Sequence, residues 1–155
     1  MITLSRTTDA YLIASLNEEV QNLHARLHPE LFKPHNAIEM EKSLSVFFAD
    51  PNCYCYLATK ENEPIGYVLF FIREIFENTF HYGRKSLYID QICVLEKHHK
   101  TGAGKILLQQ ADTLAKELSI GYIQLDHWSS NTVAAKFFRK HGYSVFREHL
   151  GKSIS

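Results

Sequence analysis

The sequence lacks the features that mark several broad classes of protein. No apolar run is long enough to span a membrane, and the segment after Met1 has no apolar core of the kind found in signal peptides. We therefore expect a cytoplasmic protein that makes no contact with a membrane. The sequence also has no internal repeat, no low-complexity segment and no linker. Its 155 residues are a usual size for one domain, so we expect a single domain over residues 1–155.

The sequence has no net charge and few cysteines. Seventeen basic and seventeen acidic side chains give a formal net charge of zero, so no overall field would attract nucleic acid or an anionic membrane. The three cysteines are an odd number, which indicates reduced thiols rather than a disulfide framework. Cys53 and Cys55 would share one face of a strand, but no second cysteine pair accompanies them, so we expect no metal site.

Apolar periodicity predicts a mixture of strands and helices, an α/β (α+β) chain. The expected strands cover residues 2–6, 53–60, 65–76, 86–94, 122–128 and 144–149. The expected helices cover about 9–26, 37–49, the stretch from the glycines at 102 and 104 to 118, and 131–141. The exposed strand edge around Val145 to Leu150 would allow a homodimer.

The most informative segment is a glycine turn between an apolar strand and an amphipathic helix. Gly102 and Gly104 let the backbone approach a ligand, and the free N–H groups at the following helix N-terminus favour a phosphate or pyrophosphate. A P-loop is excluded, because His99 and Ile106 stand where it needs a Gly and a Ser or Thr. A dinucleotide fingerprint is excluded by Leu107 in place of its third glycine. A turn that only permits tight packing is the alternative.

The pattern of this turn resembles the acetyl-CoA signature of the GNAT N-acyltransferases. That signature is a Gln or Arg, two residues, a Gly, one residue and a Gly or Ala, after a strand that ends in an apolar triplet. Ile92-Cys93-Val94 is similar to the triplet, and Gly102 and Gly104 match the two small positions. His99 departs from the usual Gln or Arg, although a histidine can still donate to a phosphate.

A second block further along the chain resembles the same family. Asn131 opens a predicted helix that ends in His141-Gly142-Tyr143, as in the second GNAT block. The resemblance covers about residues 50 to 150 by motif and the first fifty residues by topology alone. It implies a mixed, mostly antiparallel central sheet, splayed at its middle strands and flanked by helices on both faces.

The resemblance also implies a binding site for acetyl-CoA as cosubstrate. The main chain of Ile92, Cys93 and Val94 would contact the pantetheine arm. The residues that would cradle the pyrophosphate are His99, Lys100, Thr101, Gly102, Ala103, Gly104 and Lys105. Asn131 would hydrogen-bond the pantetheine arm, although a role as helix N-cap explains it equally well. Phe138 stands where many members carry the tyrosine that protonates the departing thiolate, and a phenyl ring cannot donate a proton.

The catalytic groups must therefore be sought elsewhere. Tyr143 and Tyr88 are the candidate acids, unless the thiolate, with a pKa of roughly 8 to 9, leaves unprotonated. Asp90 is the candidate base, which would take the amine proton through water. Since side chains alternate along a strand, only one of Asp90 and Gln91 should face the cleft, and Gln91 would otherwise contact the substrate.

The acceptor would be bound by the segment 20–37 and by the end of the strand near residue 128. His28 and Phe32 in that segment, and His127 and Trp128 at the strand end, are the expected substrate contacts. Nothing in the sequence identifies the amine.

The expected function is transfer of an acetyl group from acetyl-CoA to a primary amine of a small molecule or peptide, by direct attack in a ternary complex. The alternative from another class is a non-catalytic acyl-CoA-binding or interaction module, favoured by Phe138 and by the unassigned base. A third and weaker alternative is a nucleotide-phosphate binder of another fold.

Overall fold

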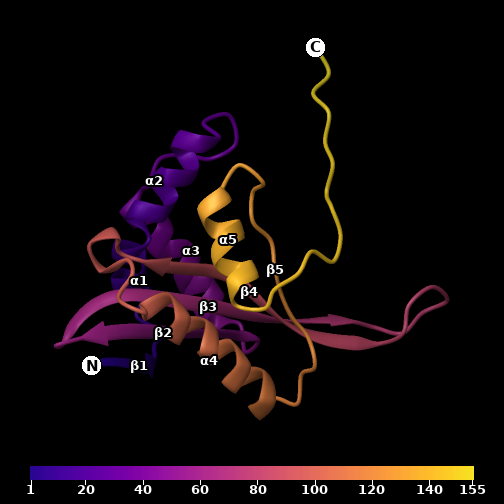
Figure 1. Ribbon diagram of the computed structural model, residues 1–155, viewed down its shortest axis with the longest axis horizontal. Helices are drawn as coiled ribbons and strands as arrows, with labels where there is room; N and C mark the ends of the chain where they lie inside the picture. Colours follow the sequence, from indigo (N-terminus) through magenta and orange to yellow (C-terminus); the bar gives the residue numbers. More distant parts are fainter.

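The computed structural model describes residues 1–155 and consists of one sheet with helices on both faces (Figure 1). The elements are β1 (Ile2–Arg6), α1 (Ala10–Leu16), α2 (Glu18–Leu27), α3 (Ala37–Ala49), β2 (Cys53–Lys60), β3 (Glu63–Ile75), β4 (Arg84–Val94), the 3₁₀ helix η1 (Glu96–His98), α4 (Ala103–Glu117), β5 (Ile123–Leu125) and α5 (Thr132–Lys140). None of the helices has the length and apolar character needed to cross a membrane.

The sheet has the strand order β1-β2-β3-β4-β5. Neighbouring strands are antiparallel except for β4 and β5, which are parallel. The parallel pair is short, because Ile89 opposite Leu125 is its last residue pair, whereas β4 continues to Val94. The predicted mixed and mostly antiparallel sheet, splayed at its middle strands, is therefore confirmed.

Two hydrophobic cores lie on opposite faces of the sheet. Val68 and Phe70 of β3 pack with α4 and α5, in a core that includes Leu107 and Phe138. Tyr67 and Leu69 of β3 point to the other face and pack with α1 and α3. This alternation follows the two-residue period of a strand buried on both faces. Helices on both faces, as predicted, are thus required by the apolar pattern of the central strands.

A β-bulge interrupts the central strand at Asp90. Leu69 of β3 pairs with Gln91, and the next residue, Phe70, pairs with Ile89, so Asp90 has no partner on β3. The extra residue places Ile89 on the α4 face and Gln91 on the α1 face, since Phe70 and Leu69 belong to those two cores. Asp90 lies close enough to Tyr67 and Cys53 of the α1 core to act on their charges, so it shares that face with Gln91. Strict alternation, on which the choice between Asp90 and Gln91 was based, is therefore interrupted at this point of the strand.

The helix predicted over residues 9–26 is broken at Asn17 into α1 and α2. The break frees backbone carbonyl groups that a continuous helix would use. The carbonyl oxygen of Ala14 lies 2.8 Å from His35 Nε2, and that of Leu16 accepts from the Cys93 thiol at 3.3 Å. The Asn17 side chain bonds to Tyr67 on the sheet. Tertiary hydrogen bonds, which a periodicity argument cannot include, explain the break.

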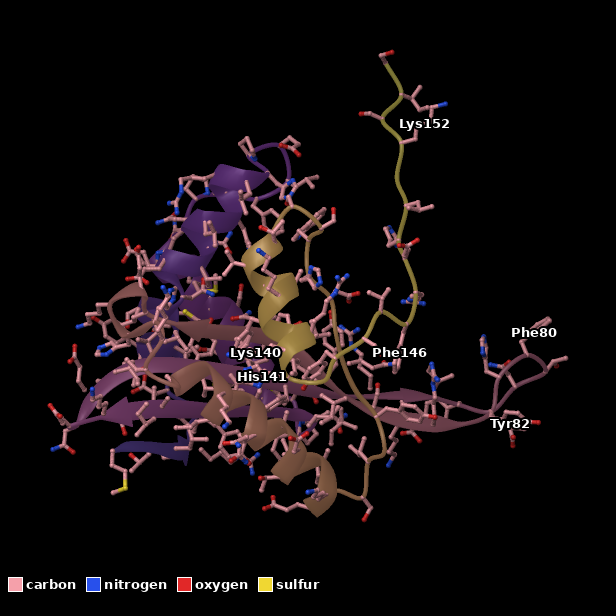
Figure 2. All side chains as sticks on the ribbon, viewed as in Figure 1. Phe80, Tyr82, Lys140, His141, Phe146 and Lys152 are labelled. Atoms are coloured by element: carbon pink, nitrogen blue, oxygen red, sulfur yellow. The ribbon has the colours of Figure 1, made fainter.

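The strand predicted over residues 144–149 is absent, and the residues after α5 form no regular structure. Gly142, with a φ of 91°, ends α5, and the chain then leads away from the sheet (Figures 1 and 2). Val145 and Phe146 are 60% and 66% exposed. The segment pairs with no strand, although the outer edge of β5 is free. The predicted strand edge around Val145 to Leu150, from which a homodimer was inferred, is therefore wrong. The homodimer itself stays a prediction.

The strand predicted over residues 122–128 is confirmed only as the three residues of β5. The residues after Leu125 separate from β4, and Trp128 packs instead against His28 and Phe32. At the other end of the sheet, the β3–β4 hairpin projects beyond its neighbours and carries exposed Phe80 and Tyr82 at its tip (Figure 2).

We expect Gly66→Ala to lower the free energy of unfolding by roughly 2 to 3 kcal/mol, the cost of overpacking a closed site. A Cβ at Gly66 would lie 2.3 Å from the carbonyl oxygen of Cys93, which is fixed in β4. The matched control is Gly121→Ala, whose Cβ would meet nothing within 4 Å. Urea denaturation measures both, and equal stability of the two variants would contradict the close β3–β4 approach.

Candidate functional site

The turn before α4 presents a row of unpaired backbone donors. No N–H group from Lys100 to Lys105 donates to a backbone or side-chain acceptor, and the first such bond in α4 runs from Ile106 to Gly102 at 3.1 Å. This row is longer than the four free N–H groups that any α-helix leaves at its start. Lys100 and Gly102 adopt positive φ angles of 61° and 89°, which curve the backbone around these donors. Such a concave set of N–H groups binds anions.

The two glycines of the turn have different surroundings. A Cβ at Gly102 would meet nothing within 4 Å, so this position opens to solvent and needs glycine for its φ of 89°. A Cβ at Gly104 would lie 3.0 Å from the ring of Phe137. Gly104 therefore allows α5 to pack closely on α4. The free donors, together with the exposed Lys100 and Lys105, fit a pyrophosphate-bearing ligand such as acetyl-CoA.

The end of β4 presents further main-chain groups beside this turn. Leu95 N–H donates to Ile65 of β3 at 2.9 Å, so by alternation the N–H and C=O groups of Ile92 and Val94 point away from β3. They point to the side that β5 has left, because β5 pairs no further than Ile89. The main-chain groups of Cys93 point towards β3. Of the predicted triplet, Ile92 and Val94 thus have main-chain groups directed to the split, and of those of Val94 the N–H group is free.

His99 reaches back to the strand end from the turn. Its Nε2 lies 2.8 Å from the carbonyl oxygen of Val94. Its ring nitrogen therefore contacts the main chain at the split, and only Nδ1 is left for another partner. Thr101 is likewise engaged locally, since its hydroxyl donates to the carbonyl oxygen of His98 at 2.7 Å.

Three predicted polar residues of β4 gather on the α1 face of the sheet. Tyr88 pairs with Phe71 and Gln91 with Leu69, and both partners pack against the α1 core. Desolvation raises the pKa of Asp90, while a hydrogen bond from Gln91 and the charge of Arg73 oppose the rise. A carboxylate with this environment, exposed to solvent, is suited to accept a proton.

Tyr88 is held by two neighbours. Its hydroxyl donates to Asp126 Oδ2 at 2.5 Å, and the Arg73 guanidinium lies 3.3 Å from its ring centroid. Desolvation, followed by the Asp126 carboxylate, raises the pKa of Tyr88 to about 12. The phenol is therefore protonated at neutral pH, as a general acid must be.

Tyr143 lies on the opposite face of the sheet. Phe138 is 7% exposed in the α4 core, and the Tyr143 ring packs against it at a centroid distance of 5.8 Å. Desolvation, and then the Asp112 carboxylate, raises the pKa of Tyr143 to about 12. His127 stacks on the other side of Phe138 at 6.3 Å. The structure thus brings Tyr143, Phe138 and His127 together but separates them from Tyr88 and Asp90.

The predicted substrate residues His28, Phe32 and Trp128 form one aromatic cluster. The ring centroid of Trp128 lies 4.6 Å from that of His28 and 5.6 Å from that of Phe32. His28 Nε2 is also 2.8 Å from Ser130 Oγ, a contact that the sequence did not suggest. The cluster joins the segment after α2 to the loop between β5 and α5.

Asn131 caps α5, because its Oδ1 accepts from Ala134 N–H at 3.1 Å. Only its amide nitrogen is left for a ligand. Sequence reasoning also missed two buried polar residues on the α1 face, Asn17 and Tyr67, which bond to each other and to Gln91. An asparagine next to the buried stripe of Ile13 and Leu16 was the available signal.

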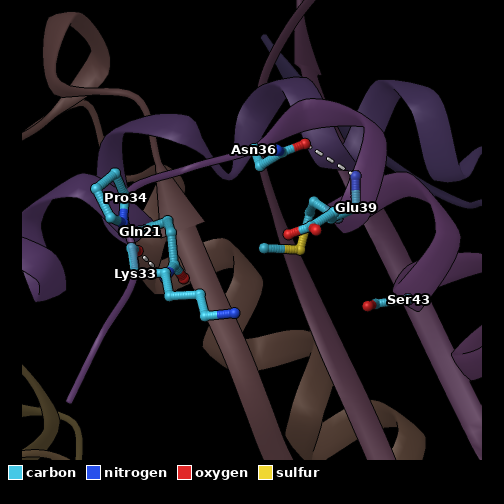
Figure 3. A pocket seen from close by; sticks show the side chains of 7 residues that line it. Gln21, Lys33, Pro34, Asn36, Glu39 and Ser43 are labelled. Carbon is cyan, nitrogen blue, oxygen red and sulfur yellow. Dashed lines mark hydrogen bonds between the residues drawn. The ribbon is translucent and has the colours of Figure 1, made fainter.

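A separate surface pocket of about 170 Å³ lies between α2 and α3 (Figure 3). Two of its polar side chains are engaged locally, since Asn36 Oδ1 accepts from Glu39 N–H and Gln21 Nε2 donates to the carbonyl oxygen of Lys33. The pocket includes no residue of β4 or of the glycine turn. No group of three or more His, Cys, Asp or Glu side chains is arranged to hold a metal ion.

A family model described as the GNAT family of acetyltransferases matches residues 17–143. A search of curated protein sequences gave no match.

Several solved structures share the fold. A mutant of the BH1408 protein from Bacillus halodurans has a TM-score of 0.91 at 17% identity, covering 100% of this chain and 99% of that chain. A predicted acetyltransferase from Clostridium acetobutylicum, solved with acetyl-CoA, has a TM-score of 0.74 at 16% identity, with 99% and 96% covered. An aminoglycoside antibiotic 6'-N-acetyltransferase from Acinetobacter haemolyticus has a TM-score of 0.72 at 18% identity, with 99% and 98% covered.

We expect the cysteines of the folded protein to resist thiol reagents at about pH 8. Burial raises the pKa of Cys53 to about 11 and those of Cys55 and Cys93 to about 12. Unfolded thiols ionise near pH 8.5, so the unfolded state loses protons first and stability falls as the pH rises above roughly 9. Labelling of the thiols by a chromogenic disulfide measures their reactivity. The midpoint of urea denaturation, measured between about pH 8 and 10, follows the stability. Rapid labelling of a folded thiol, or a midpoint that rises with pH, would contradict the burial.

Proposed function

Because the chain belongs to the GNAT family of acetyltransferases, we propose that it transfers an acetyl group from acetyl-CoA to a primary amine of a small molecule or peptide. The transfer occurs by direct attack of the amine in a ternary complex. Residues 1–155 act as a single domain in this proposal.

One observation carries the proposal. The unpaired N–H groups from Lys100 to Lys105 lie next in the chain to the strand end at which β4 loses its partner β5. The first feature suits a pyrophosphate, and the second suits an amide-bearing arm that hydrogen-bonds like a strand. Pyrophosphate and pantetheine amides are adjoining parts of one ligand, acetyl-CoA, which supplies the acetyl group as a thioester.

The chain's own residues have the following roles in the proposal. The N–H groups from Lys100 to Lys105 bind the pyrophosphate, and the main-chain groups of Ile92 and Val94 bind the pantetheine arm. Asp90 removes a proton from the ammonium form of the acceptor, through water, so that the neutral amine can attack. Tyr88, on the same face of the sheet, keeps its proton at neutral pH and is the first candidate to protonate the leaving sulfur.

The acceptor approaches from the α1 face. Carboxylates of Asp90 and Asp126 would attract a cationic amine, and the rings of Phe32 and Trp128 would support it by cation–π contact. One structural neighbour is named as an acetyltransferase of aminoglycoside antibiotics, which carry several amino groups. That likeness supports a small polyamine as the first class to screen.

We expect Thr101→Glu to weaken acetyl-CoA binding by roughly tenfold or more, because about 1.4 kcal/mol of repulsion between a carboxylate and the pyrophosphate already gives that factor. The matched control is Thr101→Gln, which has the same shape and also loses the bond to His98. Calorimetric titration with acetyl-CoA measures both, and an amine screen for free CoA release follows. Equal affinity of the two variants would contradict the pyrophosphate assignment. Binding without turnover on any amine would favour the non-catalytic alternative.

We expect Tyr88→Phe to lower kcat more than Tyr143→Phe does. Tyr88 shares a face with Asp90, whereas Tyr143 packs in the α4 core, and a general acid contributes a factor of roughly 100 or more. Steady-state kinetics with the best acceptor compares the two. The reverse order would assign the acid to Tyr143, and no effect of either would mean that the thiolate leaves unprotonated.

A further inference from the structure

A chain of buried hydrogen bonds leads from the break between α1 and α2 to the central strand. Asn17 Nδ2 donates to the Tyr67 hydroxyl at 2.8 Å, and that hydroxyl donates to Gln91 Oε1 at 2.7 Å. Asn17 Nδ2 also lies 3.5 Å from Gln91 Oε1. Tyr67 is fully buried and Asn17 is 4% exposed. The chain is therefore shielded from water over most of its length.

Each group in this series of hydrogen bonds donates to the next, and this order fixes the orientation of the Gln91 amide. A phenol has one proton, so Tyr67 can donate to Gln91 only while it accepts from Asn17. With Oε1 held by Tyr67, the Gln91 amide nitrogen is directed to the other side of the side chain. Hydrogen bonding by Gln91 in turn favours the charged form of the Asp90 carboxylate and lowers its pKa.

These buried hydrogen bonds lower the free energy of unfolding compared with an apolar core. Asn17 Oδ1 is buried and has no hydrogen-bond partner, and the helix is interrupted at the same residue. Apolar side chains at positions 17 and 67 would remove both the unpaired oxygen and the need to bury a hydroxyl. Packing alone therefore does not explain why polar groups occupy this part of the α1 core.

We propose that Asn17 and Tyr67 are positioning residues, which hold the Gln91 carboxamide so that its N–H groups orient the Asp90 carboxylate at the split between β4 and β5. The bulge at Asp90 makes this possible, because it brings the two neighbouring side chains to one face. The catalytic part of this inference rests on the proposed function, in which Asp90 is the base.

The groups around Asp90 determine how its pKa would change if the Gln91 amide were released. Arg73 of β3 and the Gln91 amide stabilise the carboxylate. The other titratable neighbours are Tyr88 on the same strand, Tyr67 of β3, Cys53 of β2 and, beyond β5, Asp126, which bonds to Tyr88. All four are acids, so none of them supplies a positive charge that would stabilise the Asp90 carboxylate. If the Gln91 amide is released, one of only two stabilising groups is lost, so the pKa of Asp90 must rise.

The test compares Tyr67→Phe with the wild-type protein. The Asp90 carboxyl is titrated by carbon NMR, assigned with Asp90→Asn. We expect its midpoint to rise by roughly half a pH unit or more in Tyr67→Phe, the size typical of one lost hydrogen bond to a carboxylate. The acidic limb of the kcat profile should move to higher pH by the same amount, with KM for acetyl-CoA unchanged. Tyr56→Phe, which removes a half-buried hydroxyl on the opposite face, is the control and should move neither.

A second variant separates positioning from folding. Asn17→Leu combined with Tyr67→Phe removes both buried polar groups together, and we expect it to fold with an unchanged or higher Tm and to show the same shift of Asp90. An Asp90 midpoint equal to that of the wild type in both folded variants would overturn the proposal. If the Asp90 midpoint shifts in the variants but the wild-type protein turns over no amine, the proposed function is overturned, and with it the catalytic role of these hydrogen bonds.

Discussion

The end of the β4–β5 pairing at Ile89 and Leu125 is the constraint on which the site depends. A strand in a closed sheet has no free main-chain groups, whereas β4 continues for several residues beside an empty position. Backbone polar groups need partners, and at this split a ligand can supply them. The glycine turn lies directly beyond this free strand end, so that one extended ligand can use both sets of donors. The proposed chemistry follows from an incomplete sheet rather than from a deep pocket.

In the proposed mechanism, two irregularities on the α1 face place the reactive side chains beside this strand edge. The bulge at Asp90 and the helix break at Asn17 each interrupt a regular hydrogen-bond pattern, and the buried bonds of Tyr67 and Gln91 connect them. Both interruptions cost stability, and both direct polar side chains to the edge where β5 has separated. Departures from a local structural rule are expected where a structure positions functional groups.

The sequence predicted the parts of the fold that depend on local pattern. Apolar alternation located β1 to β4, and the position of Gly102 before an amphipathic helix located the turn whose N–H groups are free. Features set by tertiary contacts were not predictable. The bulge at Asp90 depends on the register with β3, and the break at Asn17 on a bond to Tyr67. The residues after α5, predicted as a strand, pair with none, because the chain leads away from the sheet there (Figure 1). His99 faces Val94 because the turn folds back, which spacing alone does not indicate.

The decisive measurement is a titration of the folded protein with CoA, in which NMR follows the backbone amide signals. It tests whether the free N–H groups of the glycine turn and of β4 form the binding site. The account predicts that the largest shifts occur at the N–H groups from Lys100 to Lys105 and at Ile92 and Val94, while the hairpin tip with Phe80 stays unchanged. Binding that shifts other residues and leaves these amides unmoved would show that the free donors of the turn and of β4 do not form the site.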